Sequence, residues 1–176
     1  MDPRVREHAA IVVEHSVDLQ PGDNVVISAP PAAEDLAVAL HEVVGDVGAN
    51  PVALNSNDRF SRAYLRAREE DVELPEHALA LIEETDVYID IRANTNVTET
   101  SDVDPETTAA FQAAQKPLLD ERLSKTWCLT QFPTASHAQL AQLSTEGYEN
   151  FVWDAVNKDW DAVREHQAQL GDLLED

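Results

Sequence analysis

The chain has 176 residues, and its 34 acidic and 12 basic side chains give a formal net charge of −22. This length suits one domain with a hydrophobic core of its own. The acidic excess argues against nucleic acid as a partner, because phosphate binding needs a basic face. No apolar run approaches the ~20 residues of a membrane helix, so no membrane partner is expected. The single cysteine, Cys128, excludes an internal disulfide and a cluster of thiolate metal ligands.

The charged residues have a characteristic distribution. Nine of the 12 basic residues are arginine, and the acidic residues are scattered among the predicted helices rather than gathered in a tail. This composition resembles that of the cytosolic proteins of salt-loving archaea, where concentrated salt screens the repulsion between like charges. We therefore expect a halophilic, cytoplasmic protein. An acidic surface that serves a cationic partner is the alternative interpretation.

The N-terminal part of the chain alternates between helix and strand. Residues 3–17 place apolar side chains at helical spacing, and residues 25–29 form a short apolar run typical of a buried strand. A second helix over residues 33–47 ends before Gly48, a natural C-terminal cap. A strand at residues 51–55 then completes a strand–helix–strand unit, which requires parallel strands and a right-handed crossover.

The same alternation continues in the middle of the chain. Helices are predicted over residues 59–70 and 75–84, and a strand over residues 87–91 follows at once. Residues 92–104 are polar and rich in turn formers, which indicates a long loop. Loops of this length that follow a parallel strand often carry function.

The remainder is mostly helical. A helix over residues 105–123 precedes the fourth predicted strand, residues 127–130. Three further helices are predicted over residues 137–143, 145–157 and 160–174. The predicted fold class is therefore α/β: a single domain over residues 1–176, with about four parallel strands, flanking helices and a helical C-terminal arm.

Ligands of such sheets bind at the carboxyl ends of the strands. The segments expected at that edge are residues 28–33, 55–59, 92–102 and 130–137. The chain has neither a GxGxxG nor a GxxxxGK[ST] motif, and Pro30 and Pro31 remove amides that would hold a phosphate. Nucleotide binding by these routes is therefore not expected.

Isolated candidate residues do not add up to a catalytic set. His8 and His15 lie seven apart on one predicted helix, whereas metal-binding pairs on helices usually lie three or four apart, so we expect solvent-facing or interface residues. His137 is the only histidine predicted near the ligand edge. Arg92 ends the third strand there, either as an anchor for a carboxylate or as an internal salt-bridge partner. Cys128 is expected to be a small buried apolar residue.

At the level of the whole chain, a flavodoxin-like ligand binder is a further alternative for the function.

Several longer stretches carry a resemblance to a known family. They are MDPRVREHA at 1–9, PGDNVVI at 21–27, GANP at 48–51, ERLSKTWCLTQFPT at 121–134 and STEGYENFVW at 144–153. These stretches resemble the N-terminal half of the thermophilic-type leucyl aminopeptidases, peptidase family M29, over nearly the whole chain. The sequence departs from the family at Gln142, where a glycine is usual, and at residues 94–100, where a shorter, glycine-rich loop is usual.

The resemblance implies a metal-dependent exopeptidase that removes N-terminal residues with two zinc or cobalt ions. In the family the metal ligands lie in the C-terminal half, beyond residue 176, so no catalytic or metal-binding residue is assigned here and the chain alone is expected to be inactive. The implied role is that of a non-catalytic N-terminal domain that shapes the cleft and the assembly. Its implied partners are the catalytic C-terminal domain, peptides in the whole enzyme, and a second copy in a homodimer. A stand-alone binding or interaction module without hydrolase activity is the alternative.

The resemblance also implies that residues after the strand ends form a wall of the cleft. The candidates are Arg92, Trp127, Thr130, Phe132, Pro133, Thr134 and His137. For Trp127 and Phe132 the alternative is packing within the core of the domain itself.

Overall fold

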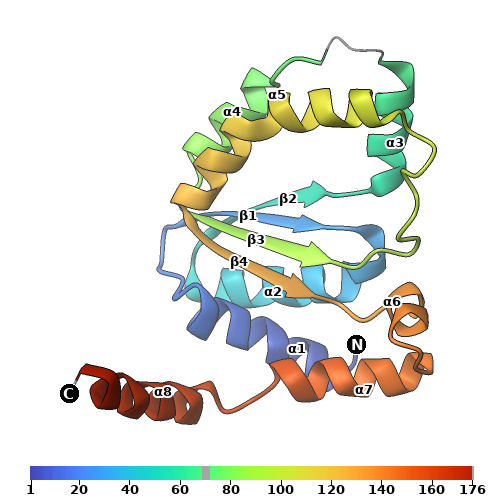
Figure 1. Ribbon diagram of the computed structural model, residues 1–176. Coiled ribbons are helices and arrows are strands. Elements are labelled where there is room, and N and C mark those ends of the chain that lie inside the picture. The colour runs from blue at the N-terminus through green and yellow to red at the C-terminus, as the bar shows by residue number, and fades with distance from the viewer. Residues whose placement is uncertain (69–71, 176) are drawn as a thin grey trace.

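A parallel four-stranded sheet forms the centre of the computed structural model, which describes residues 1–68 and 72–175 (Figure 1). Its strands are β1 (Asn24–Ala29), β2 (Asn50–Asn55), β3 (Val87–Arg92) and β4 (Thr126–Gln131), in the spatial order β2-β1-β3-β4. Ile27 of β1 lies in register with Ala53 on one side and with Ile89 on the other. The predicted α/β class, with four parallel strands, is confirmed.

Helices cover both faces of the sheet (Figure 1). The α-helices in chain order are α1 (Pro3–Ile11), α2 (Glu34–Val47), α3 (Asp58–Ala67), α4 (Glu76–Glu83), α5 (Pro105–Ser124), α6 (Ala135–Leu140), α7 (Thr145–Val156) and α8 (Trp160–Glu175). Helices α3, α4 and α5 lie over one face, α1, α2 and α7 lie over the other, and α8 extends away as the predicted C-terminal arm. No helix in the described ranges is both long enough and apolar enough to span a membrane.

Some predicted helix boundaries differ from the structure. The predicted helix 3–17 is α1 followed by a π-helical turn, η1 (Val12–Ser16), and α2 is preceded by a short 3₁₀ turn, η2 (Pro31–Ala33). The helix predicted over residues 137–143 is α6, which starts at Ala135 and stops at Leu140. The prediction for 59–70 extends to residues 69 and 70, which lie outside the described residues.

The main hydrophobic core lies between the sheet and helices α1, α2 and α7. Its buried side chains include Val25, Ile27, Ile89, Leu36, Leu40, Val13 and Trp153. The opposite face holds a much smaller buried cluster of Val26, Tyr88 and Ile82. The guanidinium of Arg122 lies 5.2 Å from the centre of the Tyr88 ring and covers this smaller cluster. Most of the apolar burial that stabilises the fold is therefore on the α1–α2–α7 side.

Two helix ends explain local features of the chain. Gly48 caps α2 with φ +86°, the left-handed conformation in which a side chain is disfavoured, as its position in the sequence predicts. At the end of α6, Gln142 adopts φ +57°. Its N–H bonds to the carbonyl of Gln139, and the N–H of Leu143 bonds to the carbonyl of Ala138 at 2.9 Å. This is a Schellman cap with glutamine in the position where glycine is commonest.

Contacts between α1 and α7 join the two ends of the domain. Nη1 of Arg4 donates to Oδ1 of Asn150 at 2.7 Å. Nδ2 of Asn157, just after α7, donates to the backbone carbonyl of Arg4 at 2.8 Å. The N-terminal helix is thus held by a segment about 150 positions later in the chain, as well as by the sheet.

Candidate functional site at the carboxyl edge of the sheet

All four strands end at the same edge of the sheet, on the right in Figure 1. Their last residues are Ala29, Asn55, Arg92 and Gln131. The chain passes from β1 to β2 on one side and returns to β3 on the other side of β1, so the order of the strands reverses between β1 and β3. In parallel sheets, ligand sites form at such a reversal.

A pocket of about 220 Å³ opens at this reversal, and we call it the edge pocket. Pro30, Pro31 and Ala32 line it after β1, and Ser56, Asn57, Asp58 and Arg59 line it after β2; Ala93, Asn94, Thr95, Asn96 and Glu99 line it after β3. Nδ2 of Asn94 donates to Oδ2 of Asp58 at 2.6 Å, so the loops after β2 and β3 hold each other. The lining offers carboxylate and amide oxygens that accept hydrogen bonds and amide and guanidinium N–H groups that donate them, so this pocket suits a polar group.

Thr134 links the β4 end to the edge pocket. Its hydroxyl donates to the backbone carbonyl of Asn94 at 2.8 Å and accepts from the N–H of His137 at 3.4 Å, as the N-cap of α6. The hydroxyl of Ser136 also donates to the carbonyl of Asn94. Thr134 is buried, which makes it a residue that positions the loop after β3.

His137 lies in a polar group with residues of β4 and α7. Nε2 of Gln131 is 3.4 Å from Nδ1 of His137 and also donates to the hydroxyl of Tyr148. The rings of His137 and Tyr148 lie 6.3 Å apart. The histidine therefore has polar neighbours that orient it, and none of these neighbours is a carboxylate or a second histidine.

Two of the predicted cleft-wall residues face the core. Thr130 is buried, and its Oγ1 lies 2.6 Å from Nε2 of His8, itself buried in α1. The ring of Phe132 packs edge-to-face on Trp153 with centroids 5.8 Å apart. For Phe132 the structure thus shows the core packing that the sequence left open.

Other predicted wall residues are accessible. Trp127 is 48% exposed on β4, so it is not part of the core, and Pro133 is half-buried. Arg92 is exposed at the end of β3, where its carbonyl accepts from the N–H of Phe132 at 2.9 Å. Among the residues that the structure describes, no carboxylate forms an ion pair with Arg92. The internal salt bridge considered for this arginine is therefore not found there.

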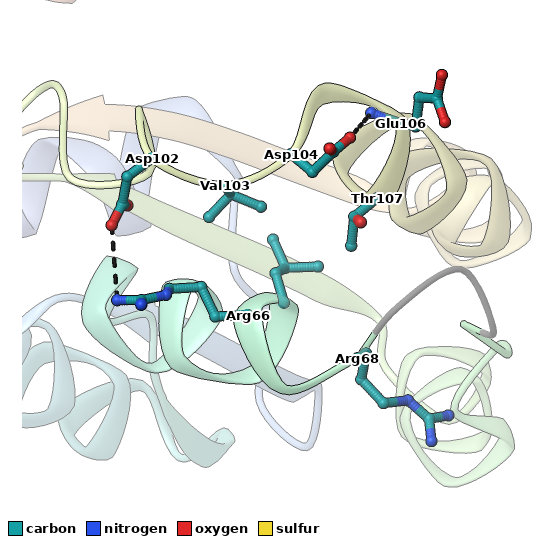
Figure 2. Close-up of a pocket in the computed structure, with 8 residues that line it drawn as sticks. Arg66, Arg68, Asp102, Val103, Asp104, Glu106 and Thr107 are labelled. Atoms are coloured by element: carbon teal, nitrogen blue, oxygen red, sulfur yellow. Dashed lines mark hydrogen bonds and ion pairs between the residues drawn. The ribbon is translucent and has the colours of Figure 1, made fainter.

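A second pocket, of about 590 Å³, lies between α3 and the start of α5 (Figure 2). Asp102 receives a bidentate bond from Arg62, and its Oδ2 lies 3.6 Å from Nη1 of Arg66. The hydrogen bond from Arg62 lowers the pKa of Asp102. Asp104 caps α5 by accepting from the N–H of Glu106 at 2.7 Å. The bonds from Arg62 and Arg66 to Asp102 hold the loop after β3 against α3.

The described residues do not fit a metal centre. Among the side chains that the structure describes, no three from histidine, cysteine, aspartate and glutamate gather as metal ligands would. The thiol of Cys128 is half-buried against the core, and burial raises its pKa, which disfavours the thiolate. No step of metal chemistry is therefore assigned to these residues.

The sequence reasoning did not identify Asp58, Asn94 or Glu99, because they match no motif. The sequence did, however, predict that the loops carrying these three residues lie at the ligand-binding edge of the sheet. The position of Asp58 and Asn94 within three residues of a strand end is the signal that could have found them.

Comparisons with known proteins relate the whole chain to one family. A family profile described as thermophilic metalloprotease (M29) matches residues 1–175. The solved structure of wild-type AmpT from Thermus thermophilus is similar with a TM-score of 0.70 and 20% identity, over 88% of this chain and 42% of that one. The chain thus spans less than half the length of AmpT. None of the curated proteins compared with the chain matches it.

Two reductase-type structures share only a weak likeness. The CurK enoyl reductase has a TM-score of 0.34 and 15% identity over 91% of this chain and 50% of that one. An alcohol dehydrogenase superfamily protein from Novosphingobium aromaticivorans has a TM-score of 0.34 and 14% identity over 86% and 47%. A likeness this weak supports no conclusion about this chain, whereas the family profile covers nearly every residue. The chain belongs to the M29 family of thermophilic metalloproteases.

Proposed function

We propose that this chain is the N-terminal, non-catalytic domain of a metal-dependent aminopeptidase, an enzyme that releases N-terminal amino acids from peptides. In this proposal the domain shapes the cleft and supports assembly, including a homodimer, and a C-terminal domain binds two divalent ions, zinc or cobalt. The supporting observation is that a metalloprotease profile matches residues 1–175 while the described residues bring no metal-ligand set together. The metal ligands of such an enzyme must then come from another segment.

The carboxyl edge of the sheet is the side on which we place the cleft. It carries the edge pocket, the exposed Arg92 and the polar group around His137. An unpaired guanidinium suits a carboxylate of a bound peptide. Three buried or half-buried residues support this wall: Thr130, Phe132 and Thr134. Their contacts with His8, Trp153 and Asn94 set the position of the end of β4 and of the loop after it. Pro133 completes the proposed wall, whereas Trp127, the second residue of β4, lies four positions before the end of the strand and away from this edge.

Zinc titration by calorimetry in concentrated salt tests the proposal on two proteins: the 176-residue chain and the longer product of the same reading frame. We expect no stoichiometric zinc on the 176-residue chain and two ions on the longer product. We also expect release of amino acids from an aminoacyl-p-nitroanilide only by the longer product, with loss of activity after chelation.

Three results would overturn the proposal. One is a downstream sequence that lacks a glutamate, histidine and aspartate set. Another is stoichiometric zinc with hydrolysis by the 176-residue chain itself. His137→Ala and the exposed control His77→Ala then show whether that zinc uses the carboxyl edge. The third is an extended product that binds zinc but releases no amino acid.

A further inference from the structure

A long segment of this highly charged chain has no charged side chain. Residues 126–145 contain no aspartate, glutamate, lysine or arginine, although such residues make up 26% of the sequence. The next longest run of this kind, residues 47–57, has only 11 residues. The segment includes β4, the loop after it, α6 and the first residue of α7.

Burial does not explain this composition. Only three residues of the segment are buried: Thr130, Thr134 and Ala138. Among the others, Leu140 is 65% exposed, Leu143 is 47% exposed and Trp127 is 48% exposed. Phe151 of α7, which packs against α6, is 62% exposed beside Tyr148. We call the exposed surface of residues 126–145, together with Phe151, the neutral face.

The neutral face is unlike the rest of the surface. The surface of a chain with a net charge of −22 is rich in carboxylates, and large apolar side chains in contact with water carry a free-energy cost. A surface that lacks carboxylates and exposes leucine, tryptophan and phenylalanine is typical of the centre of an interface, where charged residues are depleted and aromatic residues are enriched. The composition therefore indicates that another protein surface covers it.

We propose that the neutral face is the docking surface for the metal-binding domain of the same enzyme, with Leu140, Leu143 and Phe151 as its apolar anchors. This inference rests on the proposed function. The chain spans 42% of the length of AmpT, so a protein of that size has a further domain to accommodate. The three anchors lie on α6, after it and on α7, which follow the carboxyl end of β4. The docked domain is therefore placed beside the carboxyl edge, near the helix that carries His137.

Charge favours a covalently linked domain over a second copy of this chain. A second copy carries the same net charge of −22, so the two acidic molecules repel each other as they approach. A domain on the same polypeptide is held at a high effective concentration, so a moderate apolar contact is enough to keep it docked. Its docking surface is expected to be apolar and low in charge, because a dense set of carboxylates or ammonium groups would be desolvated there without partners.

Hydrogen exchange compares the 176-residue chain with the longer product of the reading frame. In the longer product we expect amides in residues 126–156 to exchange at least about tenfold more slowly than in the 176-residue chain, while α3 and α4 change little. In the longer product, Leu140→Glu with Phe151→Glu is expected to remove this protection and to separate thermal unfolding into two transitions.

The matched control is Phe60→Glu with Val38→Glu, because these side chains are exposed by 62% and 45% and lie outside the neutral face. The control is expected to leave the protection unchanged. Circular dichroism of the 176-residue forms of both variants shows that each still folds, since all four side chains are largely exposed.

Two results would overturn this inference and leave the proposed function standing. One is a longer product that binds zinc and releases amino acids but is protected elsewhere. The other is a 176-residue chain whose neutral face is already protected in a concentration-dependent dimer. A reading frame without a metal-ligand set instead removes the proposed function itself.

Discussion

Nε2 of His8 in α1 lies 2.6 Å from the hydroxyl oxygen of Thr130 in β4, and both side chains are buried. The ring of His8 also lies 5.8 Å from the ring of Trp153 in α7. Burial lowers the pKa of His8 from 6.5 to about 4, against a smaller opposing effect of the nearby Asn157 side chain. A neutral histidine thus joins three elements of the main core.

This histidine makes the stability of the fold depend on pH. Between pH 6.5 and about 4 the unfolded chain binds a proton at His8 and the folded chain does not. The free energy of unfolding therefore falls as pH drops through this range, by about 3 kcal/mol from this group. Urea unfolding at a series of pH values from 7 to 4 measures how steeply the free energy of unfolding falls with pH. His8→Gln is expected to flatten this dependence, whereas the exposed control His77→Gln keeps it. If the free energy of unfolding falls equally steeply with pH for His8→Gln and for the unmutated chain, His8 is not the source of the pH dependence.

The left-handed residue at the end of α6 predicts a stabilising substitution. Gln142 has φ +57°, a conformation that costs a residue with a side chain roughly 1 kcal/mol. Gln142→Gly is expected to raise the free energy of unfolding by up to about 1 kcal/mol. In the same helix, Gln139→Gly is expected to lower it by about 1 kcal/mol, because glycine disfavours a helix interior. Urea unfolding in concentrated salt measures both. A stabilising Gln139→Gly, or a destabilising Gln142→Gly, would show that the cap geometry is wrong.

Two aromatic residues, Trp127 at the start of β4 and Phe132 just after its end, are expected to differ in their contribution to stability. Phe132→Ala removes the contact with Trp153 and is expected to cost about 3 kcal/mol. Trp127→Ala removes a side chain that is 48% exposed and is expected to cost less than about 1 kcal/mol in the 176-residue chain. Thermal and urea unfolding measure the two costs. If Trp127→Ala is the more damaging change, the described packing of β4 is contradicted.

The charge of −22 predicts a strong dependence on salt. Raising potassium chloride from about 0.1 M to about 1 M shortens the screening length from ~10 to ~3 Å and weakens repulsion among the carboxylates. The urea concentration at the midpoint of unfolding is therefore expected to rise with salt. A variant with several exposed acidic residues of α2 replaced by their amides, Asp35, Glu42 and Asp46, is expected to depend less on salt. An unfolding midpoint that is independent of salt contradicts the interpretation of the composition.

The strands were predictable because each is a short apolar run between turn-forming residues. The predicted strand 25–29 differs from β1 by one residue, and the predicted strand 87–91 differs from β3 by one residue. The spatial order was not predictable in the same way. Alternation of strand and helix establishes parallel pairing, but it does not say that β1 lies between β2 and β3, since that depends on contacts between distant segments.

The candidate site shows the same limit. The loops at the carboxyl edge follow from the strand ends, whereas the bond between Asn94 and Asp58 joins loops 36 positions apart and leaves no sequence motif. The burial of His8 was missed for a similar reason, because its partner Thr130 is 122 positions away. The uncharged segment 126–145, by contrast, is visible in the sequence itself and needs the structure only to show that it is exposed.

The bonds from Arg4 to Asn150 and from Asn157 to Arg4 have a consequence for the order in which the chain can fold. During synthesis from the N-terminus, α1 leaves the ribosome long before α7 exists. The strand–helix–strand unit of β1, α2 and β2 can form early from local contacts, but the outer side of α1 remains open until Asn157 has emerged. Premature termination before α7 therefore leaves apolar surface of the first helix uncovered by Trp153, a target for chaperones and proteases rather than a smaller stable protein.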